Sequence, residues 1–355
     1  MMAIAKLKRA VAAAFIVLAA LMAPGPSGAQ TAAADYSFAQ LQQASKSGNI
    51  EAMSYLADAY YDGEKIAQNH ALAADWYRRA AELGDTYSQT NIGYMYENGY
   101  GVPQDDAQAF AWYQRGAASG SVVSQNNLAL YYEKGRGTLR NVNEAQRLYR
   151  EAADAGYALS QYNLGYLLAY EDDVSQNLEE AVRYFRLAAD QGNAQAQAEL
   201  GYMYERGIGV PIDYTQALYW DQQAAAQGNR QGQNNLGYFY EVGRGGVEAN
   251  PAEAARLYLA SAEQGFALAQ SNIGLMYLDG NGVLENYAEA LRWFMLAAEN
   301  GNANGQTNLG YMYENGLGVL KNIDTAIDYY QLAAAQGNET ALSNLKVLFN
   351  AGQGG

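Results

Sequence analysis

The chain has 355 residues and a formal charge of −15, and it contains 31 tyrosines, one histidine and no cysteine. The acidic balance argues against nucleic acid or an anionic membrane face as the partner, since both need a basic surface. Without cysteine there is no disulfide, zinc–thiolate site or cysteine nucleophile, and one histidine leaves little for a metal site or a conventional catalytic triad. We therefore expect a folded chain without cofactor or metal.

Residues 1–29 have the pattern of a secretory signal peptide. Lys6, Lys8 and Arg9 precede an apolar stretch over residues 10–22, and small residues follow at 27–29. The alternative, a membrane anchor, is weaker because the apolar run falls short of the ~20 residues that span a bilayer. We expect cleavage between Ala29 and Gln30, a periplasmic or secreted protein, and no membrane insertion of the mature chain.

The rest of the chain repeats a unit of about 36 residues. A glycine ends each unit, at Gly84, Gly120, Gly156, Gly192, Gly228, Gly265, Gly301 and Gly337. Eight units therefore cover residues 49–338. We expect a linker and capping helix over residues 30–48, and a capping helix with a flexible tail over residues 339–355.

Each unit predicts two helices, which we call helix A and helix B. In helix A, Leu200, Gly201 and Tyr204 lie on one side of the helix, and the glycine allows a neighbouring backbone to approach closely. Helix B follows an Asn or Asp suited to capping the helix N-terminus: Asn69, Asp105, Asn141, Asn177, Asp213, Asn250, Asn286 and Asn322. A single unit cannot bury its apolar face alone, so stacking is required. The predicted fold is all-α, an α/α solenoid (superhelix) of about eight helix-turn-helix repeats with half-repeat caps.

The unit resembles the Sel-one-like repeat (SLR), a relative of the tetratricopeptide repeat. The similarity is greatest in residues 89–102, 197–210 and 306–319, which share the pattern Gln-x-x-Leu/Ile-Gly-Tyr-Met-Tyr-Glu-x-Gly-x-Gly-Val. The resemblance implies a binding scaffold, and it implies for exported bacterial members a role as adaptors in the cell envelope. A cysteine-rich branch is associated with β-lactams, but this chain lacks the paired cysteines of that branch.

Two ladders on helix A are candidates for partner binding. An amide can both donate and accept hydrogen bonds, so asparagines could hold a partner's peptide backbone; they are Asn91, Asn127, Asn163, Asn235, Asn272 and Asn308. Glu199 stands at this position in unit 5. The alternative is that these amides bond between adjacent repeats and set the stacking angle.

The second ladder is aromatic and could project onto the concave surface. A tyrosine offers a rigid ring and a hydroxyl, which suit peptide or sugar recognition; the residues are Tyr94, Tyr166, Tyr202, Tyr238 and Tyr311. The alternative is packing between repeats. The glutamates near the end of helix A (Glu97, Glu133, Glu171, Glu205, Glu241 and Glu314) are predicted to be solvated, with an acidic rim as the alternative.

These observations predict an exported scaffold that binds a protein partner through its concave face and has no enzymatic activity. The alternative is an envelope protein that binds or hydrolyses carbohydrate, such as peptidoglycan or exopolysaccharide, motivated by the abundance of tyrosines and carboxylates.

Overall fold

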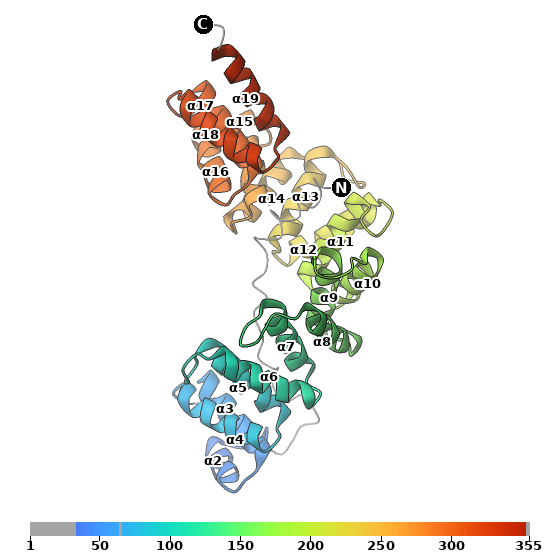
Figure 1. Cartoon of the computed structure of the whole chain (residues 1–355), viewed down its shortest axis with the longest axis vertical. Helices are drawn as coiled ribbons and strands as arrows, with labels where there is room; N and C mark the ends of the chain where they lie inside the picture. Colours follow the sequence, from blue (N-terminus) through green and yellow to red (C-terminus); the bar gives the residue numbers. More distant parts are fainter. Residues whose placement is uncertain (1–32, 64–65, 353–355) are drawn as a thin grey trace. The chain divides into compact units, whose positions relative to one another are not determined.

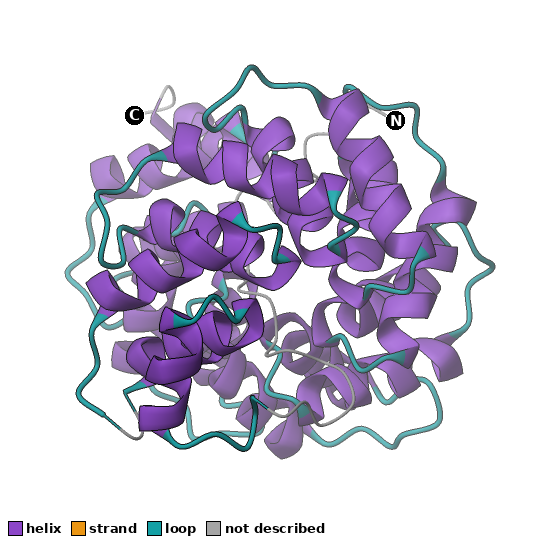
Figure 2. Ribbon diagram, turned by 90° about the horizontal axis from the view of Figure 1, so that it is seen from below, coloured by secondary structure: helices purple, strands orange, loops and turns teal. Residues whose placement is uncertain are grey.

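The computed structural model describes residues 33–63 and 66–352, and all regular secondary structure in these residues is helical (Figures 1 and 2). The predicted signal peptide over residues 1–29 lies outside the described residues, as do the last three residues of the predicted tail. Within the described residues, none of the helices is both long enough and apolar enough to cross a membrane.

The eight predicted helix pairs are all present in the described part of the chain, which confirms the predicted fold. Helices A are α3 (Ile50–Asp62), α5 (Thr86–Asn98), α7 (Val122–Lys134), α9 (Ala158–Tyr170), α11 (Ala194–Arg206), α13 (Arg230–Val242), α15 (Ala267–Asp279) and α17 (Ala303–Asn315). Helices B are α4 (His70–Glu82), α6 (Asp106–Ala118), α8 (Val142–Asp154), α10 (Leu178–Asp190), α12 (Tyr214–Ala226), α14 (Pro251–Glu263), α16 (Tyr287–Glu299) and α18 (Ile323–Ala335). The half-repeats at the ends are α2 (Phe38–Lys46) and α19 (Glu339–Gly352).

The helices form two compact units, and the division falls inside α10, between Tyr184 and Phe185. In the first unit, each helix from α2 to α8 packs on the next helix along the chain. In the second unit α11 to α19 do the same, and α11 also contacts α13. Each unit is therefore a stack of helix pairs in which neighbours supply the burial.

Local chemistry sets the helix boundaries, as the sequence predicts. The side chain of Asn322 accepts a hydrogen bond from the backbone N–H of Thr325 at 3.1 Å, and the Asn or Asp at the start of each other helix B does the same with a nearby N–H. In the loop after α5, Gly101 has φ +71°, and a Cβ there would lie 2.2 Å from the backbone carbonyl of His70. This loop therefore packs directly onto the start of α4, which is helix B of the preceding repeat.

A ring from helix B packs against the glycine of helix A. A Cβ on Gly310 would lie 2.8 Å from the Tyr330 ring, and one on Gly274 would lie 2.6 Å from the Phe294 ring. The glycine thus admits a ring of the same repeat, and the predicted approach of a backbone is also present, since a Cβ on Gly310 would lie 3.1 Å from the carbonyl oxygen of Ala326. Ala57 and Ala129 stand at this position in repeats 1 and 3, so a methyl group is tolerated there.

The C-terminal helix differs from the helices A at the position of the glycine. By repeat spacing, Lys346 of α19 stands where α17 has Gly310. The room that Gly310 leaves is occupied by the Tyr330 ring of α18, and a lysine side chain removes the equivalent room on α19. A ring cannot lie against α19 at this position as the Tyr330 ring lies against Gly310.

Candidate interaction surface

In the second unit, each helix A has one stripe of side chains that lies largely at the surface. On α17 the stripe is Asn304, Asn308, Tyr311 and Asn315, whose spacing of four, three and four places them on one face. The equivalent positions are Gln195, Glu199, Tyr202 and Arg206 on α11, Gln231, Asn235, Tyr238 and Val242 on α13, and Leu268, Asn272, Leu275 and Asp279 on α15. We call these sixteen residues the helix-A stripe. All but Glu199 are at least partly exposed.

Thirteen of the sixteen residues of the helix-A stripe are uncharged. The charged residues are Glu199, Arg206 and Asp279, and Glu199 is buried. Aromatic, aliphatic and amide groups without charge are typical of the buried centre of a protein–protein interface.

The predicted tyrosine ladder lies partly in the fold and partly on its surface. Tyr311 is 44% exposed, while the other four are half-buried. The guanidinium of Arg206 lies 5.9 Å from the Tyr202 ring, and that of Arg244 lies 5.7 Å from the Tyr238 ring. In the first unit, Tyr94 and Tyr166 contact the rings of Tyr100 and Tyr170 respectively. Tyr311 is thus the ladder tyrosine most available to a partner.

The asparagine ladder differs between the two units. Asn91, Asn127 and Asn163 are buried, and Asn163 donates a hydrogen bond of 2.9 Å to Asn126 of the preceding repeat. Asn235, Asn272 and Asn308 are partly exposed. Asn235 donates to Asp221 at 3.0 Å, and Asn272 donates to Asn234 at 3.0 Å. These bonds join adjacent repeats, which supports the stacking alternative for the amides that make them. Partner binding by the ladder stays a prediction.

The prediction that the glutamates near the end of helix A are solvated was wrong for Glu97, Glu133 and Glu205, which are buried, while Glu241 and Glu314 are partly exposed. Glu97 and Glu133 are 7% and 8% exposed. The hydroxyl of a buried helix-B tyrosine donates to four of these carboxylates: Tyr113 to Glu97 at 2.7 Å, Tyr149 to Glu133 at 2.9 Å, Tyr258 to Glu241 at 2.6 Å and Tyr330 to Glu314 at 2.7 Å. Burial, reinforced by Glu133, raises the pKa of Tyr149 well above its ordinary value. The hydroxyl therefore stays protonated and serves as a donor.

In repeats 4 and 7 both members of the Tyr–Glu pair are replaced by apolar residues. Repeat 7 has Phe294 in place of the tyrosine, and Leu278 in place of the glutamate, and the two pack in one apolar cluster. The sequence has Phe185 and Ala169 at the corresponding positions of repeat 4. The sequence shows a spacing of 16 or 17 residues between the tyrosine and the glutamate. The spacing alone does not show that the packing of helix B on helix A brings the two side chains together.

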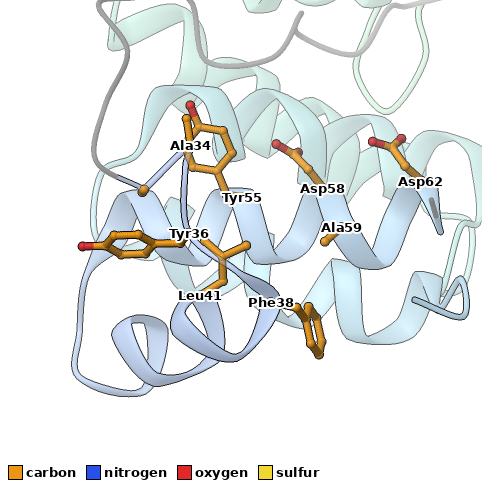
Figure 3. A pocket seen from close by; sticks show the side chains of 9 residues that line it. Ala34, Tyr36, Phe38, Leu41, Tyr55, Asp58, Ala59 and Asp62 are labelled. Carbon is orange, nitrogen blue, oxygen red and sulfur yellow. The ribbon is translucent and has the colours of Figure 1, made fainter. Parts of the chain in front are cut away.

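In repeat 1 an aspartate of helix A accepts the hydrogen bond from the buried tyrosine of helix B. The hydroxyls of Tyr77 and Tyr87 both donate to Asp58, the second at 2.7 Å. Asp58 also lines a cavity of about 150 Å³ between α2 and α3, and its carboxyl projects from α3 on the same side as that of Asp62 (Figure 3). Burial raises the pKa of Asp58 to about 6, against the lowering effect of the two hydroxyls.

Within residues 33–63 and 66–352, no three His, Asp or Glu side chains are grouped so that they could hold a metal ion.

A family model for the Sel1 repeat matches eight consecutive segments: residues 50–85, 86–121, 122–157, 158–193, 194–229, 230–266, 267–302 and 303–338. The chain belongs to the Sel1 repeat family. Sel1 repeat proteins are generally non-catalytic scaffolds for protein–protein interaction. The matched segments begin one residue after the boundaries expected from the glycines.

Two solved structures are similar over most of the Sel1 repeat chain. The c5321 protective antigen of uropathogenic Escherichia coli, which has an SLR fold, is 35% identical, and its TM-score is 0.73. The alignment covers 89% of this chain and 68% of the antigen. A Sel1 repeat protein from Oxalobacter formigenes is 30% identical, and its TM-score is 0.62. The alignment covers 94% of this chain and 98% of the Oxalobacter protein. No curated protein matches the chain.

The Tyr–Glu pair predicts a coupled effect on stability. Tyr258→Phe leaves Glu241 without the hydroxyl donor, which should cost about 1–3 kcal/mol in the free energy of unfolding. Adding Glu241→Leu reproduces the natural pair of Phe294 and Leu278, and should recover part of that loss. Urea unfolding and hydrogen exchange of α13 and α14 measure both effects. Tyr219→Phe, at an exposed tyrosine of α12, is the control. Purely additive effects of the two substitutions would contradict the coupling.

Asp58 predicts a loss of stability with rising pH. Because the pKa of Asp58 in the folded state, about 6, lies above its ordinary value of 3.8, the stabilisation is present at pH values below 3.8 and is lost as the pH rises through 6. The decrease in the free energy of unfolding should reach up to about 3 kcal/mol. Asp58→Asn keeps an oxygen acceptor for both tyrosines and should flatten the profile. Hydrogen exchange of α3 and α4 between pH 4 and 7 measures this, with exposed Asp35→Asn as the control; an unchanged profile in Asp58→Asn would exclude Asp58 as the cause.

Proposed function

We propose that this Sel1 repeat protein is an exported scaffold that binds a protein partner in the cell envelope through its helix-A stripe. The observation that carries the proposal is the recurrence of one face over four successive helices A: fifteen of its sixteen side chains are at least partly exposed, and thirteen of the sixteen are uncharged. A partner can desolvate a face of aromatic, aliphatic and amide side chains at little cost, because the buried centres of interfaces are depleted in charge.

The shape of the stripe suits an extended stretch of polypeptide. Three successive helices A pair an apolar or aromatic side chain with an amide: Tyr238 with Asn235, Leu275 with Asn272, and Tyr311 with Asn308. Asn235 and Asn272 each use one N–H in a bond between repeats, so their oxygen and second N–H would have to serve the partner. Amides that pair with a peptide backbone and pockets that take alternate side chains are the usual means of holding such a segment. A suitable partner is the extracytoplasmic domain of a sensor or a component of envelope assembly.

Export is the second part of the proposal. It rests on the basic, apolar and small-residue segments within residues 1–29. The similarity to c5321, a protective antigen, is consistent with it. Fractionation of cells followed by N-terminal sequencing should give a mature chain that begins at Gln30, whereas a cytoplasmic chain retaining Met1 would refute export.

Tyr311 and Leu275 are the test of the interaction surface. A photo-crosslinking residue at 311 should capture a discrete partner in living cells, and Tyr311→Ala with Leu275→Ala should weaken binding of that partner by about tenfold or more, as expected for interface anchors. The melting temperature should change little, because both side chains are substantially exposed.

The matched control is Tyr219, a tyrosine of α12 that is 48% exposed and lies off the stripe. A crosslinker at 219 should not capture the same partner, and Tyr219→Ala should leave binding unchanged. Equal capture from both positions, or equal loss of binding, would show that the helix-A stripe is not the specific surface.

A further inference from the structure

Repeat 5 breaks the pattern of rings and glutamates. Asp221 of α12 stands where helix B of the later repeats has Tyr258, Phe294 and Tyr330. It is fully buried, at 0% exposed, and its Oδ1 would lie 2.3 Å from a Cβ on Gly201. The carboxyl thus occupies the position of the missing ring against helix A, but it is too short to reach as far along that helix as a tyrosine hydroxyl.

The surroundings of Asp221 are acidic. Its Oδ1 accepts a hydrogen bond of 3.0 Å from the amide of Asn235 on α13, and its Oδ2 has no hydrogen-bond partner among the described residues. The charged groups that act on it are Glu205 and Glu199, both from α11 and both 9% exposed. Arg206 reaches Glu205 only at 3.7 Å.

An ionised Asp221 would be costly in this place. A buried carboxylate without a counter-charge carries a desolvation cost of several kcal/mol, and two neighbouring glutamates add repulsion. A protonated carboxyl avoids both and supplies an O–H that can donate to an acidic neighbour. Burial, followed by the charges of Glu205 and Glu199, accordingly raises the pKa of Asp221 well above its ordinary value.

We propose that Asp221 makes repeat 5 a proton-operated weak point of the stack: α12 packs between α11 and α13 while the carboxyl is protonated, and loss of the proton loosens this packing. The folded state holds the proton more tightly than the unfolded chain does. The stabilisation is therefore complete at acid pH and is lost as the pH rises through the folded-state pKa. Since α11 and α13 carry Tyr202 and Tyr238, the same proton would control the order of this part of the helix-A stripe.

Hydrogen exchange of the full mature chain between pH 5 and 9, corrected for the intrinsic exchange rate, tests this inference. Protection of α11 and α12 should fall about 10- to 100-fold with rising pH relative to α17 and α18, where Tyr330 and Glu314 form the ordinary pair. Asp221→Asn should remove that fall. Asp221→Tyr should restore a hydroxyl donor to Glu205, remove the fall and raise the protection at every pH.

Exposed Asp190→Asn is the control and should behave as the wild type does. Equal pH dependence of the two helix pairs in the wild type would overturn the inference, as would a fall that persists in Asp221→Asn. If Asp221→Tyr does not fold, Asp221→Asn alone decides between these outcomes. None of these readouts requires the partner, so the inference can fail while the proposed binding function stands, and the reverse also holds.

Discussion

The architecture depends on how one side chain of helix B meets helix A. A tyrosine or phenylalanine ring lies against a glycine or alanine, so the two helices of a repeat approach closely and the ring is fully buried. A tyrosine then carries a hydroxyl into the core, and a buried hydroxyl must find a partner. In repeats 2, 3, 6 and 8 the glutamate near the end of helix A is that partner, and in repeat 1 it is Asp58. The phenylalanines of repeats 4 and 7 need no such partner, and Ala169 and Leu278 stand at the position of the glutamate. The acidic residues of helix A are thus partly a consequence of core packing and not of solubility.

The sequence allowed the repeat length, the two helices of each repeat and their boundaries to be predicted, because each depends on local chemistry. Asn322 and Gly101 act within a few residues of themselves, and eight copies of the pattern remove ambiguity. Glu97 could not be placed in this way. Considered as part of an isolated helix, a glutamate near the C-terminus is disfavoured by the helix dipole and belongs in solvent, but a hydroxyl from Tyr113, 16 residues later, changes its environment. Interactions between helices override such local preferences.

The asparagine and tyrosine ladders show that the repeat spacing does not predict how exposed a side chain is. Asn91 and Asn308 occupy one position of the repeat, yet the first is buried and the second is partly exposed. Spacing identifies the face of the helix, whereas exposure depends on the residues that surround it in neighbouring repeats. Tyr311 is the most exposed ladder tyrosine for the same reason, and the tyrosine ladder is not a uniform surface. A partner of the helix-A stripe would therefore be held more by some repeats than by others.

Stacked repeats can tolerate an exception that a single-core domain could not. Stability in such a stack is close to a sum of repeat terms and nearest-neighbour terms, so the cost of burying Asp221 falls on α11, α12 and α13 and leaves distant repeats intact. A repeat array can therefore keep one strained repeat without losing its fold. In repeat 5 the missing ring, the unpartnered oxygen and the two buried glutamates occur together at one place. Each alone would be a defect; together they make the packing of one repeat depend on a single proton, while the other repeats retain their own pairs.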